Sequence, residues 1–364
     1  MRSLRGSWRR SIVNAERPCG HDQVLEGLWG AARAERLPHA LLFSGGEGIG
    51  KFMAARWFLA GMFCEEGPGE PCGSCGACRR LQAGSFGDLL LIEPGVEGAE
   101  RIKLGRIARR DEDGGVCLEE FLGLRAAEGG WRGVILRDAE RATREAQNAL
   151  LKTLEEPGEA CCLILVSAHP GRLLETVRSR CVQVGLVAPE LGACAEVLAR
   201  AGYEAEIAGR VSRWAGGAPG RALAWARRGV VAERGLLLGI LGGELDALQG
   251  TSEVLELEGE LGEGTPSVLV RRRAVGVVEL GVEVLRDLAR LGAGVAASEL
   301  AHGDVPQEIA SRARVRGVTR AGLEVLWRAR GELDSHLAPE AVLDRALSEL
   351  QEIFVGARAP VGGR

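Results

Sequence analysis

The sequence predicts an α/β domain followed by all-helical domains, in a chain of 364 residues. Between about residues 37 and 186, short apolar runs alternate with longer helical patterns, as the βα units of a parallel sheet do. After Pro189 the strand signal ends and helical periodicity continues. The length favours two or three domains, and the 46% of hydrophobic residues favours well-formed cores.

Five apolar runs are the predicted strands of the sheet: residues 40–43, 89–92, 133–136, 162–166 and 182–184. Before the fourth run, apolar residues recur at helical spacing from Ala146 to Leu154. Pro157 is expected to stop this helix, and Lys152 to project from it into solvent or a subunit interface.

The rest of the chain is predicted to be helical. Residues 190–248 read as several short helices, broken at 201–202 and 216–217. After a further break at 250–251, long amphipathic helices are expected at 266–291, 317–333 and 339–354.

The composition argues against several classes of function. A formal net charge of -4 provides no general basic field for nucleic acid or anionic membranes, and 4% of aromatic residues provides few stacking platforms. No run of 18 apolar residues is present, so we expect a cytoplasmic protein. The arginine run at 271–273 is interpreted as a solvated helix face rather than a DNA site.

A glycine-rich loop follows the first predicted strand and opens a predicted helix. Its spacing is G-x-x-x-x-G-K, with Gly45, Gly50 and Lys51 as the candidate phosphate-binding residues. Glycines let successive backbone N–H groups converge on a phosphate, and the lysine adds positive charge. The next residue is Phe52, where a working site places a Ser or Thr hydroxyl on magnesium.

The acidic pair that an ATPase needs on a neighbouring strand is also incomplete. In one register Arg137 replaces the metal-binding acid; in the other, Asp138 holds the metal but Ala139 replaces the second acid. We therefore predict little or no intrinsic ATPase activity, and ATP binding stays open. A tight strand-to-helix turn that holds no nucleotide is an equally good interpretation of the loop.

Four cysteines lie within fifteen residues, at Cys64, Cys72, Cys75 and Cys78, among glycines and prolines that favour turns. A closed set of four thiolates is typical of structural zinc. An iron–sulfur cluster is a weaker alternative, because Arg79 follows where a ferredoxin-like pattern would supply a further cysteine; free thiols are the third. The other six cysteines are expected to pack in the core.

The order of the motifs makes a resemblance specific. The glycine loop, the cysteine module, the run Asn-Ala-Leu-Leu-Lys-Thr-Leu-Glu-Glu-Pro at 148–157 and Ser-Arg-Cys at 179–181 follow one another. In this the chain resembles the bacterial DNA polymerase III clamp loader subunits. The resemblance implies an AAA+ fold: a nucleotide-binding-like α/β domain at 1–187 with the zinc module at 64–78, a helical lid at 188–249, and a C-terminal helical collar for ring assembly at 250–364.

The resemblance also implies roles for three further residues. Arg180, in Ser-Arg-Cys, corresponds to an arginine finger inserted into a neighbouring subunit's ATP site; on its own such a tripeptide is more simply a surface arginine. Ser167 and Arg221 correspond to the sensor 1 and sensor 2 positions. The defective phosphate site resembles the delta-prime branch of the family rather than its gamma and tau motors.

The implied function is that of a non-catalytic ring member. Its partners would be the gamma/tau and delta subunits and, through the complex, the sliding clamp and primed DNA. Two alternatives stay open: an active gamma/tau-like ATPase, which Phe52 and Arg137 oppose, and a stand-alone zinc-bearing nucleic-acid-binding protein, which the composition opposes.

Overall fold

The computed structural model describes residues 17–94, 101–109, 116–128, 130–158, 160–262, 264–335 and 337–357. The chain divides into two compact units. The first comprises Met1–Ala193 and Ala218–Gly220, and the second comprises Cys194–Gly217 and Arg221–Arg364. A lid and a collar are a finer division of the helical region than this one, and their boundaries stay a prediction.

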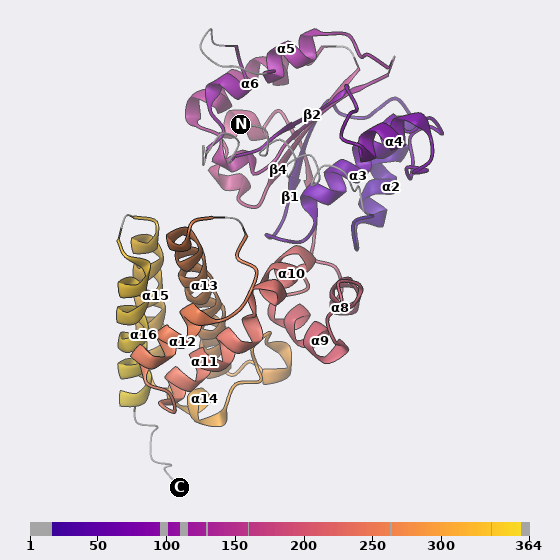
Figure 1. Cartoon of the computed structure of the whole chain (residues 1–364). Coiled ribbons are helices and arrows are strands. Elements are labelled where there is room, and N and C mark those ends of the chain that lie inside the picture. Colours follow the sequence, from indigo (N-terminus) through magenta and orange to yellow (C-terminus); the bar gives the residue numbers. More distant parts are fainter. Residues whose placement is uncertain are drawn as a thin grey trace. The chain divides into compact units, whose positions relative to one another are not determined.

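A parallel sheet forms the centre of the first unit (Figure 1). Its strands are β1 (Ala40–Ser44), β2 (Leu89–Ile92), β3 (Arg132–Leu136), β4 (Cys161–Ser167) and β5 (Val182–Gly185). The order across the sheet is β2-β3-β4-β1-β5, and each neighbouring pair is parallel. All five predicted strands are confirmed. Because β1 lies between β4 and β5, the order reverses there, and such switch points are where open α/β sheets bind ligands.

Helices cover both faces of this sheet. One layer holds α2 (Asp22–Arg33), α3 (Lys51–Phe63) and α4 (Gly76–Gln82), and the other holds α5 (Leu118–Gly123), α6 (Arg144–Glu155) and α7 (Glu175–Arg178) (Figure 1). Side chains alternate along β1, so that Leu41 and Phe43 pack toward α3 while Ala40 and Leu42 pack toward α6. Two apolar cores, one on each face, hold the sheet in place.

Helix α6 illustrates how the sequence defines an element. Thr143 is its N-cap, and the Thr143 hydroxyl accepts a hydrogen bond from the Ala146 N–H at 3.3 Å. Its apolar residues face the core, where Leu150 and Leu154 are buried. The helix ends at Glu155, two residues before Pro157, as predicted.

The second unit is all-helical within the described residues. Its helices, entered through α8 (Leu191–Arg200), are α9 (Ala205–Trp214), α10 (Pro219–Arg228), α11 (Val230–Gly242), α12 (Ala247–Glu256), α13 (Pro266–Gly292), α14 (Gln307–Ala313), α15 (Val318–Leu333) and α16 (Pro339–Gly356). Their buried side chains form one continuous core. The predicted fold class, α/β plus all-α, is confirmed, and so are the three long C-terminal helices.

The predicted helix break at residues 250–251 is wrong, because α12 runs through it. Gly250 serves close packing instead. A Cβ atom at this position would lie 2.6 Å from Cδ1 of Ile240 on α11. The glycine therefore permits two helices to approach each other, a requirement that the local sequence pattern does not reveal.

The interpretation of the arginine run at 271–273 as a solvated face is wrong for Arg273, which is 1% exposed. Its guanidinium donates to Oε1 of the buried Glu233 at 2.7 Å and to the Leu257 carbonyl at 2.7 Å. Arg228 donates to the other Glu233 oxygen at 2.9 Å. The charge is tolerated inside the unit because it is paired and hydrogen-bonded.

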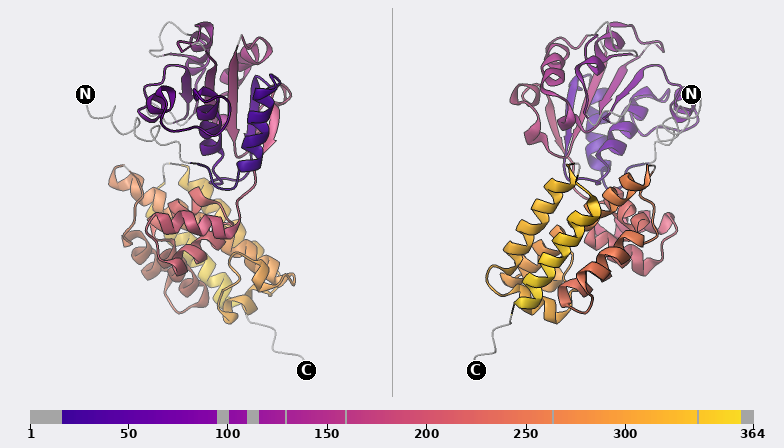
Figure 2. Two further views of the ribbon diagram at one scale, coloured as in Figure 1. Left: turned by 90° about the vertical axis from the view of Figure 1, so that its right-hand side faces the viewer. Right: turned by 60° about the vertical axis from the view of Figure 1, so that its left-hand side comes forward.

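Helices α15 and α16, drawn in the yellow part of the colour range, lie side by side (Figure 2). Ion pairs between Arg328 and Glu349 and between Arg345 and Glu332 connect them. Across the described part of the chain, no helix has both the length and the apolar character needed to cross a membrane.

Candidate functional site

The glycine loop connects β1 to α3 at the carboxyl end of the sheet. Gly48 and Gly50 have φ angles of 72° and 98°, which residues other than glycine rarely adopt. A Cβ atom at Gly45 would lie 2.2 Å from the Leu186 carbonyl oxygen, so this residue must also be glycine. These backbone conformations are compatible with the predicted phosphate loop at a helix N-terminus.

Lys51 is 7% exposed and lies under this loop. Its Nζ donates to the carbonyl oxygens of Gly45 and Gly46 at 2.9 and 2.6 Å. Burial lowers the pKa of Lys51, whereas the nearby carboxylates of Glu140 and Glu47 raise it. The lysine is therefore placed beside the loop, with acidic side chains close enough to hold its charge.

Two contacts fix the shape of the loop from outside. The Gly220 N–H donates to the Gly48 carbonyl at 2.7 Å, and the His21 ring donates from Nε2 to the Ile49 carbonyl at 2.8 Å. Burial lowers the pKa of His21. A rigid loop of this kind loses little entropy when it binds a ligand.

The two residues at the positions of the expected magnesium ligands contact each other. Phe52 stands where a hydroxyl ligand would be expected, and Arg137 follows β3 where the metal-binding acid would stand. The Arg137 guanidinium carbon lies 4.9 Å from the centroid of the Phe52 ring, a cation–π contact. Arg56, one turn along α3, lies 5.7 Å from the same centroid.

Magnesium is the cation that a phosphate loop usually employs, and the residues present do not fit it. The ring of Phe52 offers no oxygen, and the Arg137 guanidinium brings positive charge to the place of a cation. Arg137 is instead paired with Glu93 at 3.2 Å. Asp138 remains as one acid, with a φ angle of 48° and a pKa that burial raises.

Glu140 binds the backbone through one oxygen, while its Oε2 is buried and has no hydrogen-bond partner among the described residues. One of its oxygens accepts hydrogen bonds from the Ala168 and His169 N–H groups at 3.1 and 3.3 Å. Ser167, at the predicted sensor 1 position, is fully buried, and its hydroxyl accepts from the His169 N–H at 3.1 Å. These bonds order the segment that follows β4.

Arg221, at the predicted sensor 2 position, belongs to the second unit. Its Nε donates to the Ala215 carbonyl at 3.1 Å, and its guanidinium lies 3.8 Å from Glu283 and 5.4 Å from the centroid of the Trp225 ring. The partners seen for Arg221 all lie in that same unit. Its sensor role stays a prediction.

Arg180 lies on the surface just after α7, with 37% of its side chain exposed. One terminal nitrogen donates to Glu155 at 2.6 Å, and the other donates to the Thr176 carbonyl at 3.0 Å. Glu155 is the last residue of α6. The pair therefore holds Arg180 to the end of the helix that the Asn-Ala-Leu-Leu-Lys motif forms.

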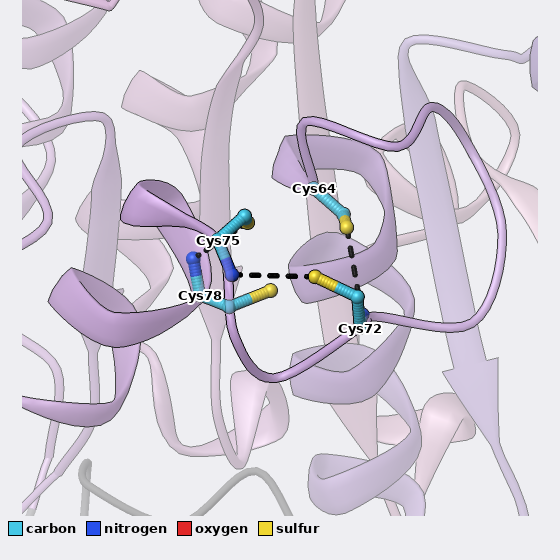
Figure 3. Close-up of side chains that lie close together, drawn as sticks. All are labelled: Cys64, Cys72, Cys75 and Cys78. Carbon is cyan, nitrogen blue, oxygen red and sulfur yellow. Dashed lines mark hydrogen bonds between the residues drawn. The ribbon is translucent and has the colours of Figure 1, made fainter.

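The structure brings together the four predicted metal ligands, Cys64, Cys72, Cys75 and Cys78 (Figure 3). Their sulfur atoms all lie within 4.8 Å of one another. A tetrahedral zinc ion with Zn–S bonds of about 2.3 Å separates its sulfurs by roughly 3.8 Å, so a small inward movement accommodates the ion. The donor set is all sulfur, which zinc favours.

Backbone N–H groups point at these sulfurs, as in metal-binding knuckles. The Cys72 N–H donates to Cys64 Sγ at 3.5 Å, and the Cys75 and Cys78 N–H groups donate to the preceding cysteine at 3.4 and 3.3 Å. Burial opposes ionisation of Cys75, but hydrogen bonds from the Glu65 and Cys78 backbone lower its pKa to about 7. Burial raises the pKa of Cys64 and of Cys78, so Cys75 ionises most readily of these three thiols.

The cysteine module packs directly on the helix that begins at the phosphate loop. Cys64 follows the last residue of α3, and Gly61 of α3 faces the module's loop. A Cβ atom at Gly61 would lie 1.9 Å from the Gly69 carbonyl oxygen. The side chain of Arg33 donates to the Pro68 carbonyl at 2.8 Å, which attaches the same loop to α2.

A sheet that reverses its order at β1, with a glycine loop and lysine between β1 and α3, defines the class: an α/β unit of the P-loop type. Residues 20–190 match the family described as "DNA polymerase III, delta subunit". The chain is 36% identical over 159 residues to "DNA polymerase III subunit delta'" of Bacillus subtilis, covering 44% of this chain and 45% of that one. It is 36% identical over 170 residues to "DNA polymerase III subunit tau" of Escherichia coli, covering 46% and 25%.

Residues 20–190 of this chain are therefore similar to the delta-prime and tau subunits of DNA polymerase III. The matched region spans about half the length of its delta-prime relative. Among solved structures, a gamma subunit-related protein from Thermotoga maritima is 18% identical with a TM-score of 0.42, over 90% of this chain and 98% of that one.

Sequence reasoning missed two partners at these sites, Glu93 of Arg137 and Glu155 of Arg180. Glu93 follows β2 as Arg137 follows β3, and Ile92 is in register with Leu136. The strand order β2-β3 would have revealed the first pair, because residues that follow paired strands are neighbours. The second pair joins two elements 25 residues apart and has no local sequence signal.

Proposed function

We propose that this chain is a non-catalytic subunit of the DNA polymerase III clamp loader. In this role it completes an AAA+ ring and donates Arg180 in trans to the ATP site of a neighbouring subunit. The neighbour hydrolyses ATP while the complex places the sliding clamp on primed DNA. The ring partners are gamma/tau and delta subunits, and the clamp and DNA are reached through the complex.

The observation that carries this proposal is the contact between Phe52 and Arg137. Both positions serve magnesium in an active site, and here they hold a ring and a guanidinium that pack on each other at 4.9 Å. A guanidinium stacked on that ring, and paired with Glu93, excludes a divalent cation from its usual place. This favours a chain without its own ATPase over the active gamma/tau-like alternative.

The exposure and the contacts of Arg180 support a role in trans. It is partly exposed, and it follows a helix rather than lining the chain's own glycine loop. Its contacts with Glu155 and with the Thr176 carbonyl engage one N–H of each terminal nitrogen. A guanidinium has five N–H donors, so three remain for a phosphoryl group in a neighbouring site.

We also propose that the four cysteines bind one structural zinc ion. The four sulfurs lie together with N–H groups pointing at three of them, and a site closed by four thiolates leaves no position for substrate. The ion would fix the loop that packs on α2 and α3, and take no part in hydrolysis.

The test is ATP hydrolysis by the reconstituted cognate clamp loader with clamp and primed DNA, comparing this chain with its Arg180→Ala variant. The matched control is Arg172→Ala, which removes an exposed arginine from the same unit. Assembly of each complex is checked by size-exclusion chromatography. Single-turnover measurement isolates the site next to Arg180 from the others.

The expected result is a loss of about 10³- to 10⁵-fold at the adjoining site for Arg180→Ala, with the control unchanged. The total ATP hydrolysis rate of the complex then falls by the fraction that this one site contributes. If Arg180→Ala assembles and hydrolyses ATP like the control, Arg180 is a structural surface residue. Magnesium-dependent turnover by the isolated chain would revive the active ATPase instead.

A further inference from the structure

We propose that the glycine loop binds a phosphate group without a divalent cation, with the guanidinium of Arg137 at the place of the metal and its acidic ligand. The loop keeps the glycine conformations expected of a phosphate loop, whereas Phe52 and Arg137 beside it do not fit magnesium. This inference goes beyond the function proposed above: that function uses the Phe52–Arg137 contact only against a metal site, whereas this inference states what the loop binds.

The charge of Arg137 can be compared with that of an acidic ligand and its bound magnesium ion. In a magnesium site this position carries a carboxylate of charge minus one beside an ion of charge plus two, which together leave one positive charge. Arg137 brings one positive charge by itself. Position 137, counted together with the metal that it would bind, therefore carries the same formal charge in both cases; the carboxylates of Glu93 and Asp138 beside Arg137 are not part of this comparison.

The shape of the Arg137 guanidinium also suits a phosphate. A guanidinium is planar, always charged, and presents paired donors that match two phosphate oxygens. In Arg137, Nη1 faces Glu93 at 3.2 Å and Nε lies 3.8 Å from Asp138. Among the residues that the structure describes, no partner is seen for Nη2, so this nitrogen is available to an anion.

Phe52 explains how the arginine stays in place. Its ring lies 4.9 Å below the guanidinium carbon of Arg137, and Glu93, 17% exposed, fixes one terminal nitrogen. A flexible arginine would lose side-chain entropy on binding an anion, whereas one stacked and paired beforehand loses less. The contacts with Phe52 and Glu93 thus hold the positive charge of Arg137 in one position.

The rest of the cradle is intact, which makes phosphate the ligand class. Gly48 and Gly50 hold a left-handed backbone in the loop, and Lys51 lies beneath it with its Nζ on the loop carbonyls. Inorganic pyrophosphate and ADP both carry the required group. A comparison of the two distinguishes a free polyphosphate from a nucleotide.

The experiment is calorimetric titration of the full chain with pyrophosphate and with ADP, each in EDTA and in magnesium. One variant, Arg137→Gln, removes the charge while keeping a polar side chain. Another, Phe52→Thr with Arg137→Asp, returns the hydroxyl and the acid that magnesium needs. Arg172→Gln is the control for loss of an exposed arginine, and thermal unfolding confirms that every variant is folded.

The chain is expected to bind in EDTA at least as tightly as in magnesium. Arg137→Gln should weaken binding about tenfold to a hundredfold, the scale of a charge-assisted hydrogen bond, while the control stays unchanged. The double variant should bind only with magnesium. The proposal is overturned by absence of saturable binding to either probe, by binding that requires magnesium, or by an Arg137→Gln variant that matches the control.

Discussion

Gly61→Ala is expected to destabilise the first unit by forcing the cysteine module away from α3. The new Cβ would lie 1.9 Å from the Gly69 carbonyl oxygen and 2.7 Å from Nε1 of Trp29. Ordinary contact needs more than 3 Å, and the obstacle is backbone, so the whole loop must shift by about 1 Å or more. Overpacking of this kind costs about 1–3 kcal/mol, occasionally more.

Gly27→Ala is the matched control, because Gly27 lies within α2 and nothing lies within 4 Å of its new Cβ. Alanine favours a helix over glycine by about 1 kcal/mol at either site, so this gain is common to both variants. The difference between them measures the overpacking alone. We expect Gly27→Ala to raise the free energy of unfolding, and Gly61→Ala to fall below it by about 1–3 kcal/mol.

The assay is urea unfolding of the zinc-loaded chain, together with the rate at which a thiol reagent modifies the cysteines. A displaced loop should expose the four thiols and speed their modification in Gly61→Ala only. If Gly61→Ala is as stable as Gly27→Ala and its thiols react no faster, the module does not pack on α3, and the argument from Gly61 is refuted.

Three further outcomes follow from the structure. Cys78→Ser should reduce the bound zinc, measured by metal analysis, from one equivalent to well below one. It should also lower the unfolding temperature, because structural zinc contributes folding free energy directly. An unchanged zinc content would contradict the assignment of Cys78 as a ligand. Glu155→Gln should change the free energy of unfolding by less than about 1 kcal/mol, because Glu155 and Arg180 are both partly exposed. In the reconstituted complex this variant should lower ATP hydrolysis, but by less than Arg180→Ala does. An equal loss of hydrolysis in both variants would mean that Glu155 acts on its own. His302, whose pKa burial lowers to about 4, should favour unfolding as pH falls from about 6.5 to 4, because the unfolded chain then binds a proton that the folded one rejects. The Nε of Arg234 donates to its Nδ1 at 3.3 Å, and His302→Phe should remove up to about 3 kcal/mol of this acid sensitivity in urea unfolding at several pH values.

The elements that sequence reasoning predicted well depend on local pattern. A buried parallel strand is a short apolar run between turn residues, and β4, with all seven residues buried, is such a run. The glycine loop and the cysteine cluster were predictable for the same reason, since each lies within fifteen residues and spacing alone defines its geometry.

The elements that it missed depend on partners distant in the sequence. Glycine favours a helix break at Gly250, but the residue lies inside α12, where a Cβ atom would come within 2.6 Å of Cδ1 of Ile240. A run of three arginines favours a solvated face for Arg273, but Glu233, forty residues earlier, pairs with it inside the unit. Neither partner is visible until the helices are placed.

The separate positions of the two arginines make the two parts of the proposed function, a missing metal site and an arginine that acts in trans, compatible within one chain. Helix α6 begins a few residues after Arg137 and ends at Glu155, which holds Arg180, and its twelve residues span about 18 Å. Between these ends, Gln147 accepts a hydrogen bond from the Leu174 N–H at 2.7 Å, so the segment leading to Arg180 is fixed to the helix itself. Substitutions at sites farther apart than about 10 Å with no shared partner act independently. Replacing the metal ligands therefore leaves the support of Arg180 intact, and selection on the two sites can proceed separately.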